Sequence, residues 1–146
     1  MRILFAKKKR TCEVSFRDTL LLAGIPIVTF KNGNKYFNFI IDTGATSSLI
    51  NKSVINEFNA DKIDGNDVVC GLDPNVEFKS EKFKIQLECD NEKFDVTFGA
   101  IDLDATFNSL QEDSGIYVSG ILGSDFLERH KYILDYNKMI IYHNNE

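Results

Sequence analysis

The sequence predicts an all-β fold, mainly β structure with one or two short helices, in a single domain. Apolar and polar residues alternate along two neighbouring segments, 82–89 and 93–101, and this period of two is typical of half-exposed strands. Asp90 and Asn91 lie between the segments and favour a turn, so the pair should form an antiparallel hairpin. The length of 146 residues suits one domain with one hydrophobic core.

A second hairpin is expected earlier in the chain, within residues 25–42. Asn32 and Gly33 separate its two β-rich runs, and both residues tolerate the positive φ that a tight hairpin turn needs. This hairpin leads directly to Asp42, a carboxylate that follows an apolar run. An acid beside an apolar strand is costly to desolvate unless it is paired, hydrogen-bonded or protonated, so Asp42 is a candidate functional residue.

Helical signals are short and follow two tight turns of small residues. Segments 53–58 and 124–130 each begin with a serine, Ser53 or Ser124, which we expect to act as the N-cap. Each segment is followed by a return to β structure, which suggests a quasi-repeated half-domain. The acidic stretch 101–115 is similar to a calcium loop in composition but lacks the ligand spacing, so we expect a solvated connection there.

Charge and composition argue against several classes of function. The net charge of −5 disfavours a nucleic-acid-binding surface, which would need a basic face. The basic cluster Lys7–Arg10 is either a solvated N-terminal arm or a contact for an anionic lipid or polymer. No stretch reaches the ~20 apolar residues of a membrane span, and the first residues do not have the order of a secretion signal. Cys12, Cys70 and Cys89 lack CxxC spacing, which favours reduced thiols, so we expect a soluble cytoplasmic protein.

Other reaction chemistries find little support in the residues. His130 and His143 are the only histidines, and neither has metal-ligand spacing to a cysteine or to the other, so we expect no metal site and no cofactor. Ser-His-Asp catalysis would need one of them as a base, and both are interpreted as surface polar residues. The chain also lacks the glycine motifs that bind phosphate groups.

Two segments resemble the retropepsin-like aspartic proteases. "IIDTGATSSLI", residues 40–50, resembles the active-site loop of that family, and "SGILGSDFLERHKYILDYNKMIIY", residues 119–142, resembles the later part of its domain. About 80 positions separate the two motifs, which also suits the family. The resemblance covers residues 24–142. It implies a closed β-barrel-like aspartic protease half-domain over 24–146, with 1–23 as an N-terminal arm or an added strand.

The resemblance implies an aspartic endopeptidase that hydrolyses peptide or protein substrates. Such enzymes hold two carboxylates about 3 Å apart so that they share one proton; the ionised acid activates a water, and the protonated acid polarises the scissile carbonyl. The chain has a single D-[TS]-G motif, which begins at Asp42. The second acid would therefore come from the Asp42 of another copy, in a homodimer that shares the active site across a two-fold axis.

The family pattern also implies roles for the neighbours of Asp42. Thr43 would hydrogen-bond across the dimer axis, and Gly44, followed by Ala45, would allow close approach of the backbone to a bound water. Thr46 stands where the family often has an Asp that binds substrate backbone. The expected structural residues beside the site are Ile121, Leu122, Gly123 and Asp125. Among these, the carboxylate is assigned to hydrogen bonding and not to catalysis.

A substrate-covering flap is expected between the two motifs, in segment 69–78. Its substrate-binding residues would be Val69, Cys70, Gly71, Leu72, Asp73, Pro74 and Asn75. An ordinary surface hairpin has the same composition, so both interpretations stay open. Two alternatives to the enzyme also remain: a catalytically inactive binding or dimerisation module with the retropepsin fold, and a small-ligand β-barrel. The intact Asp42-Thr43-Gly44 motif favours the enzyme.

Overall fold

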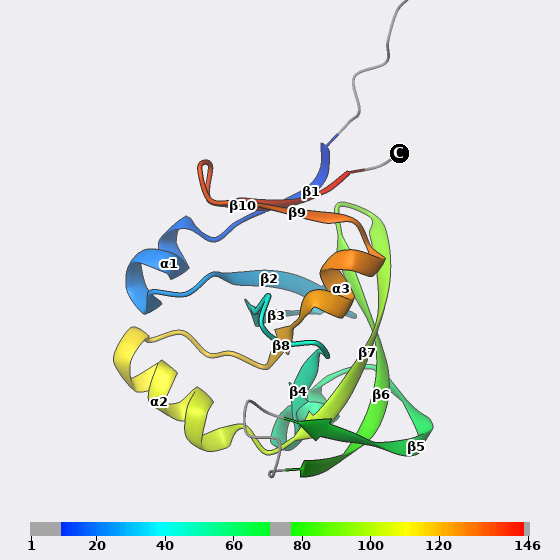
Figure 1. Ribbon diagram of the computed structural model, residues 1–146. Helices are drawn as coiled ribbons and strands as arrows, with labels where there is room; N and C mark the ends of the chain where they lie inside the picture. Colours follow the sequence, from blue (N-terminus) through cyan, green and yellow to red (C-terminus); the bar gives the residue numbers. More distant parts are fainter. Residues whose placement is uncertain (1–9, 71–76, 145–146) are drawn as a thin grey trace, which may run out of the picture.

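The computed structural model describes residues 10–70 and 77–144, and six of the described strands close into a barrel (Figure 1). Their order around the barrel is β2 (Ile27–Asn32), β3 (Lys35–Ile41), β8 (Gly120–Leu122), β4 (Leu49–Asn51), β7 (Glu92–Ile101) and β6 (Glu77–Cys89). The pairing of Lys31 with Glu88 joins β2 to β6 and closes the ring. A further strand, β5 (Ala60–Cys70), pairs with β6 along the edge that β2 meets at Glu88. The predicted β-barrel fold is confirmed.

Both expected hairpins form, and one of them turns at a different place. β6 and β7 are antiparallel, and Asp90 and Asn91 between them have φ values of 49° and 66°, as a tight turn requires. In the β2–β3 hairpin, Gly33 has positive φ, but Asn32 remains in β2 and pairs with Lys35. The Asn32 side chain is buried and donates to the Gln86 carbonyl at 2.9 Å. The turn therefore begins one residue later than expected, because Asn32 pairs within the β2–β3 hairpin and its side chain hydrogen-bonds to β6.

A smaller sheet lies across one end of the barrel (Figure 1). It consists of β1 (Arg10–Ser15), β10 (Ile140–Asn144) and β9 (Tyr132–Asp135), all antiparallel. The β1–β10 register shifts between Thr11 and Val14, and Cys12 in this irregular stretch has a φ of 50°. The bulge turns the Cys12 side chain inward, where it is fully buried.

The helical content exceeds what the sequence predicts. Segment 53–58 corresponds to a 3-10 helix, η1 (Lys52–Glu57), and segment 124–130 to α3 (Ser124–Arg129). The expectation of serine N-caps is wrong, because Asn51 and Gly123 occupy the cap positions. Two further helices, α1 (Arg17–Ala23) and α2 (Asp104–Ser114), were not expected. No helix among the described residues is long and apolar enough to cross a membrane.

The acidic stretch 101–115 contains α2 and is not a solvated connection. Asp104, in the first turn of α2, accepts hydrogen bonds from Asn51 Nδ2 at 2.8 Å and from Ser53 Oγ at 2.6 Å. These two bonds lower the pKa of Asp104. Phe107 on the inner side of the helix is buried. The helix therefore forms because long-range contacts hold its first turn and its one buried side chain, Phe107.

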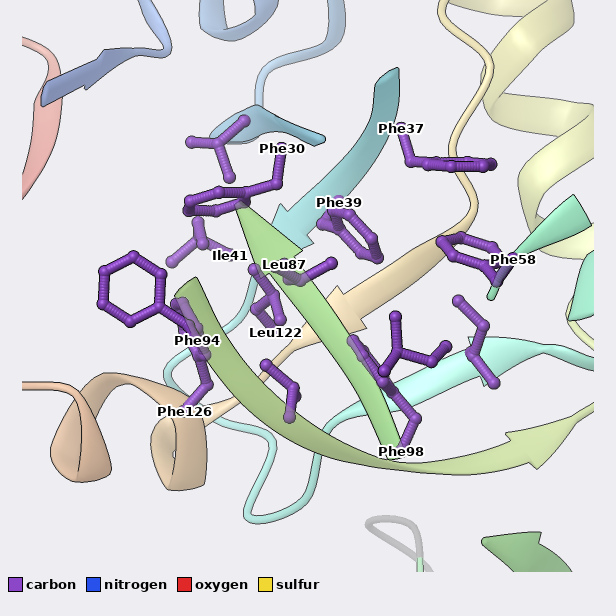
Figure 2. Close-up of a cluster of buried hydrophobic side chains, with 14 of the residues drawn as sticks. Phe30, Phe37, Phe39, Ile41, Phe58, Leu87, Phe94, Phe98, Leu122 and Phe126 are labelled. Atoms are coloured by element: carbon purple, nitrogen blue, oxygen red, sulfur yellow. The ribbon is translucent and has the colours of Figure 1, made fainter. Parts of the chain in front are cut away.

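Phenylalanine side chains dominate the core inside the barrel (Figure 2). Phe39 of β3 stacks on Phe98 of β7, with ring centroids 5.8 Å apart. Phe37 stacks on Phe58, which follows η1, at 3.8 Å. Phe126 anchors α3 against the same core and is 2% exposed. Ile41 and Leu122, at the ends of β3 and β8, belong to the same core, and the candidate site follows these strand ends.

Candidate active site

Asp42 is the first residue after β3, at the place where β3 runs parallel to β8. Ile41 is the last paired residue of β3, opposite Leu122 of β8. The Asp42 amide continues this contact and donates to the Leu122 carbonyl at 3.0 Å. The Asp42 side chain is exposed. The Asp42 backbone continues the sheet, but its carboxylate is exposed. Within a single chain the carboxylate therefore does not incur the desolvation cost that the apolar sequence before it suggested.

A tight loop holds the Asp42 carboxylate by one of its oxygens. The Gly44 amide donates to Asp42 Oδ1 at 2.9 Å, and the Ala45 amide donates to the Asp42 carbonyl at 3.1 Å. A Cβ atom on Gly44 would lie 3.2 Å from Oδ1, so a larger residue would crowd the carboxylate. Within the described part of the chain, Asp42 Oδ2 has no hydrogen-bond partner. The Gly44 amide therefore positions Oδ1, and Oδ2 can accept a further hydrogen bond.

Residues at the start of α3 hydrogen-bond to the Asp42 loop and hold its conformation. Ser124 donates twice to the loop, from its amide to the Ala45 carbonyl at 2.8 Å and from its hydroxyl to the Thr43 carbonyl at 2.7 Å. A Cβ on Gly123 would lie 2.6 Å from the Ala45 carbonyl oxygen, so this close approach requires glycine. Ser124 thus acts as a clamp between the two motifs, and not as a helix cap.

Asp125 forms the second half of this clamp. Its Oδ2 accepts a hydrogen bond from the Ser48 amide at 3.0 Å, and its Oδ1 accepts one from the Ser48 hydroxyl at 2.8 Å. The same hydroxyl oxygen accepts a hydrogen bond from the Gly123 amide at 3.0 Å. Ser48 is completely buried. Sequence reasoning missed Ser48, although its place in the run of small polar residues after Asp42 was visible.

The remaining residues of the loop and the expected structural residues beside it differ in how far they are exposed. Thr43 and Thr46 have exposed side chains, and Ala45 is half-buried. Of the structural residues expected beside the site, Leu122 is buried in the core and Ile121 is half-buried. The exposed residues of the loop are therefore Asp42, Thr43, Gly44, Thr46 and Ser47.

The expected flap falls largely outside the described residues. Val69 and Cys70 lie at the end of β5, where the backbone pairs with Phe78 and Glu77 of β6. Gly71, Leu72, Asp73, Pro74 and Asn75 lie outside the described residues. β5 and β6 thus form an antiparallel pair on either side of the candidate segment.

Both histidines differ from their interpretation as surface polar residues. His130 is half-buried, and its Nε2 contacts the Asp95 carbonyl at 3.0 Å. Burial lowers the pKa of His130. His143 is also half-buried, and its Nδ1 hydrogen-bonds to the His130 carbonyl. Neither histidine is bonded to the Asp42 loop in the described residues.

Comparison with known proteins agrees with this arrangement. Residues 27–126, more than half of the chain, match the family model described as aspartyl protease. The chain belongs to this aspartyl protease family. The matched region includes the Asp42 loop and the clamp formed by Ser48, Ser124 and Asp125.

Similarity to a solved structure shows that the fold is retropepsin-like. A retropepsin-like aspartic protease from Rickettsia conorii is similar, with 15% sequence identity, a TM-score of 0.54, and coverage of 97% of this chain and 98% of that chain. The retroviral protease-like domain of Ddi1 from Leishmania major matches with 15% identity, a TM-score of 0.49, and coverage of 84% and 95%. No curated protein matches the chain.

Proposed function

We propose that the protein is an aspartic endopeptidase whose active site forms between two copies of the chain, with Asp42 of each as the catalytic residue. The observation that carries this proposal is the state of the Asp42 carboxylate. It is exposed, the Gly44 amide holds one of its oxygens, and its other oxygen has no partner among the described residues. A carboxylate in this state can approach both a second carboxylate and a water.

The chain does not offer a second acid for the dyad within the same loop cluster. Asp125 is the carboxylate clamped to the Asp42 loop, but Ser48 binds both of its oxygens. Breaking these bonds would leave the buried Ser48 amide and hydroxyl without partners, which is costly. The partner of Asp42 is therefore best supplied by a second copy of the chain, related by a two-fold axis.

In the proposed dimer, the two Asp42 carboxylates share one proton because like charges at short range cannot both ionise. The ionised copy removes a proton from a water that attacks the scissile carbonyl. The protonated copy donates a hydrogen bond to the carbonyl oxygen and so stabilises the developing negative charge. The Gly44 amide keeps each carboxylate oriented during the reaction.

Three neighbouring features complete the proposal. The exposed Thr43 lies beside Asp42, where its hydroxyl would contact the partner subunit's loop. Thr46, also exposed, would face the substrate backbone. The segment between β5 and β6, with Val69 to Asn75, would close over a bound peptide as a flap. No metal or cofactor takes part, since the two carboxylates supply both the base and the acid.

A peptidase assay with a matched pair of variants tests this proposal. The wild-type chain, Asp42→Asn and Asp113→Asn are incubated with a diverse peptide pool at several pH values, and products are identified by mass spectrometry. Asp113 lies near the end of α2 and is exposed, so its variant controls for the loss of one surface charge. We expect internal cleavage by wild type and Asp113→Asn only. If the folded wild-type chain cleaves nothing at any pH, the alternative of an inactive binding module replaces the proposal.

A further inference from the structure

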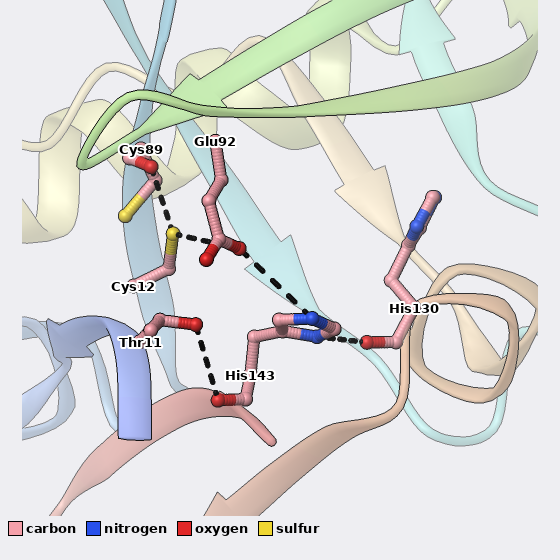
Figure 3. A network of polar contacts seen from close by, with 6 residues as sticks. All are labelled: Thr11, Cys12, Cys89, Glu92, His130 and His143. Atoms are coloured by element: carbon pink, nitrogen blue, oxygen red, sulfur yellow. Dashed lines mark hydrogen bonds and ion pairs between the residues drawn. The ribbon is translucent and has the colours of Figure 1, made fainter. Parts of the chain in front are cut away.

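A second cluster of reactive side chains lies where β1, the β6–β7 turn and β10 meet (Figure 3). Cys12 of β1 and Cys89 at the end of β6 are 77 positions apart in the sequence, yet Cys12 Sγ donates to the Cys89 carbonyl at 2.8 Å. The ligand atoms of Cys12, Cys89 and Asp90 all lie within 4.8 Å of one another. The cluster shares no residue with the Asp42 loop.

Further polar groups surround these three side chains. Glu92, the first residue of β7, has its Oε2 atom 3.8 Å from Cys12 Sγ. The same oxygen lies 3.9 Å from Nε2 of His143 on β10. The His130 carbonyl can only accept, so His143 Nδ1 donates to it, and Nε2 faces the Glu92 carboxylate. Figure 3 shows His143 and Glu92 on the same side of the cysteine pair.

A buried hydroxyl group beside the same cluster has no partner among the described residues, and its ring lies 5.8 Å from the His143 ring, centroid to centroid. Tyr132 on β9 is 8% exposed, and its hydroxyl has no hydrogen bond of acceptable geometry among the described residues. Burial raises the pKa of this hydroxyl, and the nearby side chains of Cys12, Cys89 and Glu92 raise it further. An unsatisfied buried hydroxyl is unfavourable, so it indicates a missing acceptor at this place. A thiolate on Cys12 would be such an acceptor.

Two carboxylates lie close to the thiol pair. Burial, the contact between the thiols and the nearby carboxylates all raise the pKa of Cys12, and burial raises the pKa of Cys89. Thiols in this state stay protonated and are poor nucleophiles. Among the described residues, no lysine or arginine forms an ion pair with Asp90 or Glu92. A bound dication would balance the charge of the two carboxylates and would stabilise both thiolates beside them.

We propose that Cys12, Cys89 and Asp90 bind a borderline-soft divalent cation of the zinc class. Two thiolates and one carboxylate are a donor set that suits such an ion, and binding releases the two thiol protons to solvent. Among the described residues, Glu92, with its Oε2 atom 3.8 Å from Cys12 Sγ, offers a further ligand for the fourth position. The Tyr132 hydroxyl donates to the coordinated sulfur of Cys12. The ion would tie β1 to the β6–β7 turn and so fix the small sheet on the barrel.

The proposal is tested by titrating the reduced, metal-free full-length chain with Co²⁺ and following the thiolate-to-metal absorption band in the near ultraviolet. We expect one equivalent of Co²⁺ to bind, and Zn²⁺ to displace it. Cys12→Ser and Cys89→Ser should each abolish the band. Cys70→Ser is the matched control and should retain it, because Cys70 lies at the far end of the β5–β6 pair, next to Glu77.

Two more variants separate a metal site from a structural thiol pair. Asp90→Asn, at an exposed position, should weaken Co²⁺ binding without unfolding the chain. Tyr132→Phe should weaken it by roughly 10-fold, and should leave the metal-free chain as stable as wild type or more stable, because it removes an unpartnered hydroxyl. Asp42→Asn should bind Co²⁺ like wild type.

Three results would overturn the proposal. The first is the absence of a thiolate-to-metal band at millimolar Co²⁺ in folded, reduced protein. The second is a band that survives in both Cys12→Ser and Cys89→Ser. The third is a chain purified without reductant that contains a Cys12–Cys89 disulfide, found by peptide mapping, and that binds no Co²⁺ after reduction. That result would assign the pair to thiol oxidation instead.

Discussion

Asp42 and Asp125 both follow a strand of the parallel β3–β8 pair, but their carboxylates have opposite surroundings. Asp42 is exposed and accepts one hydrogen bond from its own loop, through the Gly44 amide. Asp125 accepts two hydrogen bonds from the completely buried Ser48, which belongs to the other loop. The two acids therefore have different roles in the proposed site. The Asp42 carboxylate keeps one oxygen without a partner among the described residues, whereas the Asp125 carboxylate holds the Asp42 loop through Ser48.

The largest expected effect is on catalysis, at Asp42. In the proposed mechanism Asp42 ionises to activate water, so Asp42→Asn should lower peptidase activity by roughly 10²–10⁴-fold or more. The fold should remain, because the exposed side chain has no role in the core. Peptide cleavage rates and circular dichroism measure both effects. Wild-type turnover in this variant would exclude Asp42 as the catalytic residue.

The next effect is on stability, at Asp125. Asp125→Ala leaves the buried Ser48 amide and hydroxyl without their acceptor, which should lower the free energy of unfolding by about 1–3 kcal/mol. Urea denaturation followed by circular dichroism measures this change, with Asp113→Asn as the charge control. An unchanged midpoint would mean that the Ser48–Asp125 clamp does not stabilise the fold.

A smaller effect on stability is expected from the other side of the same clamp. Ser48→Ala removes one hydrogen bond to Asp125 and one from the Gly123 amide, but it keeps the Ser48 amide bonded to Asp125. The free energy of unfolding should fall by about 1–2 kcal/mol. Combined with Asp125→Ala, the loss should be less than additive, because both variants break the same contact. Full additivity in this double-mutant cycle would contradict the clamp.

The smallest expected effect is on kcat, from a change at Gly44 beside Asp42. Gly44→Ala places a methyl group 3.2 Å from Asp42 Oδ1 and keeps the proposed catalytic carboxylate. The displaced carboxylate should lower kcat by on the order of 10-fold or more, since sub-ångström positioning matters at the reacting groups. The urea midpoint should move little, because the loop surface is exposed. Unchanged kcat would show that Gly44 does not position Asp42.

The sequence predicts the parts of the fold that depend on neighbouring residues. Asp90 and Asn91 turn the β6–β7 hairpin as their preference for positive φ indicates. Asn32 does not take part in its turn, because its side chain is needed by the Gln86 carbonyl across the barrel. That bond joins residues 54 positions apart, and no local pattern reveals it.

The same distinction between local and distant contacts explains what was missed elsewhere. α2 has an acidic, weakly apolar sequence, and its first turn depends on Asn51 and Ser53. Ser48 gains its role only when β3 and β8 come together. The Cys12–Cys89 contact joins two strands that are far apart in the sequence, so cysteine spacing along the chain does not predict it. The Asp42 motif was visible because its residues are contiguous.

A subunit-mixing experiment tests the central claim, that two copies of Asp42 form one site, most directly. Wild-type chain is mixed with a tenfold excess of Asp42→Asn, and subunit exchange is verified by native mass spectrometry of differently tagged chains. Because a mixed dimer has only one ionisable Asp42, wild-type activity should fall to about one tenth. The same excess of Asp113→Asn should instead raise the total rate. Unchanged activity after complete exchange, or full activity of a verified monomer, would contradict the shared site.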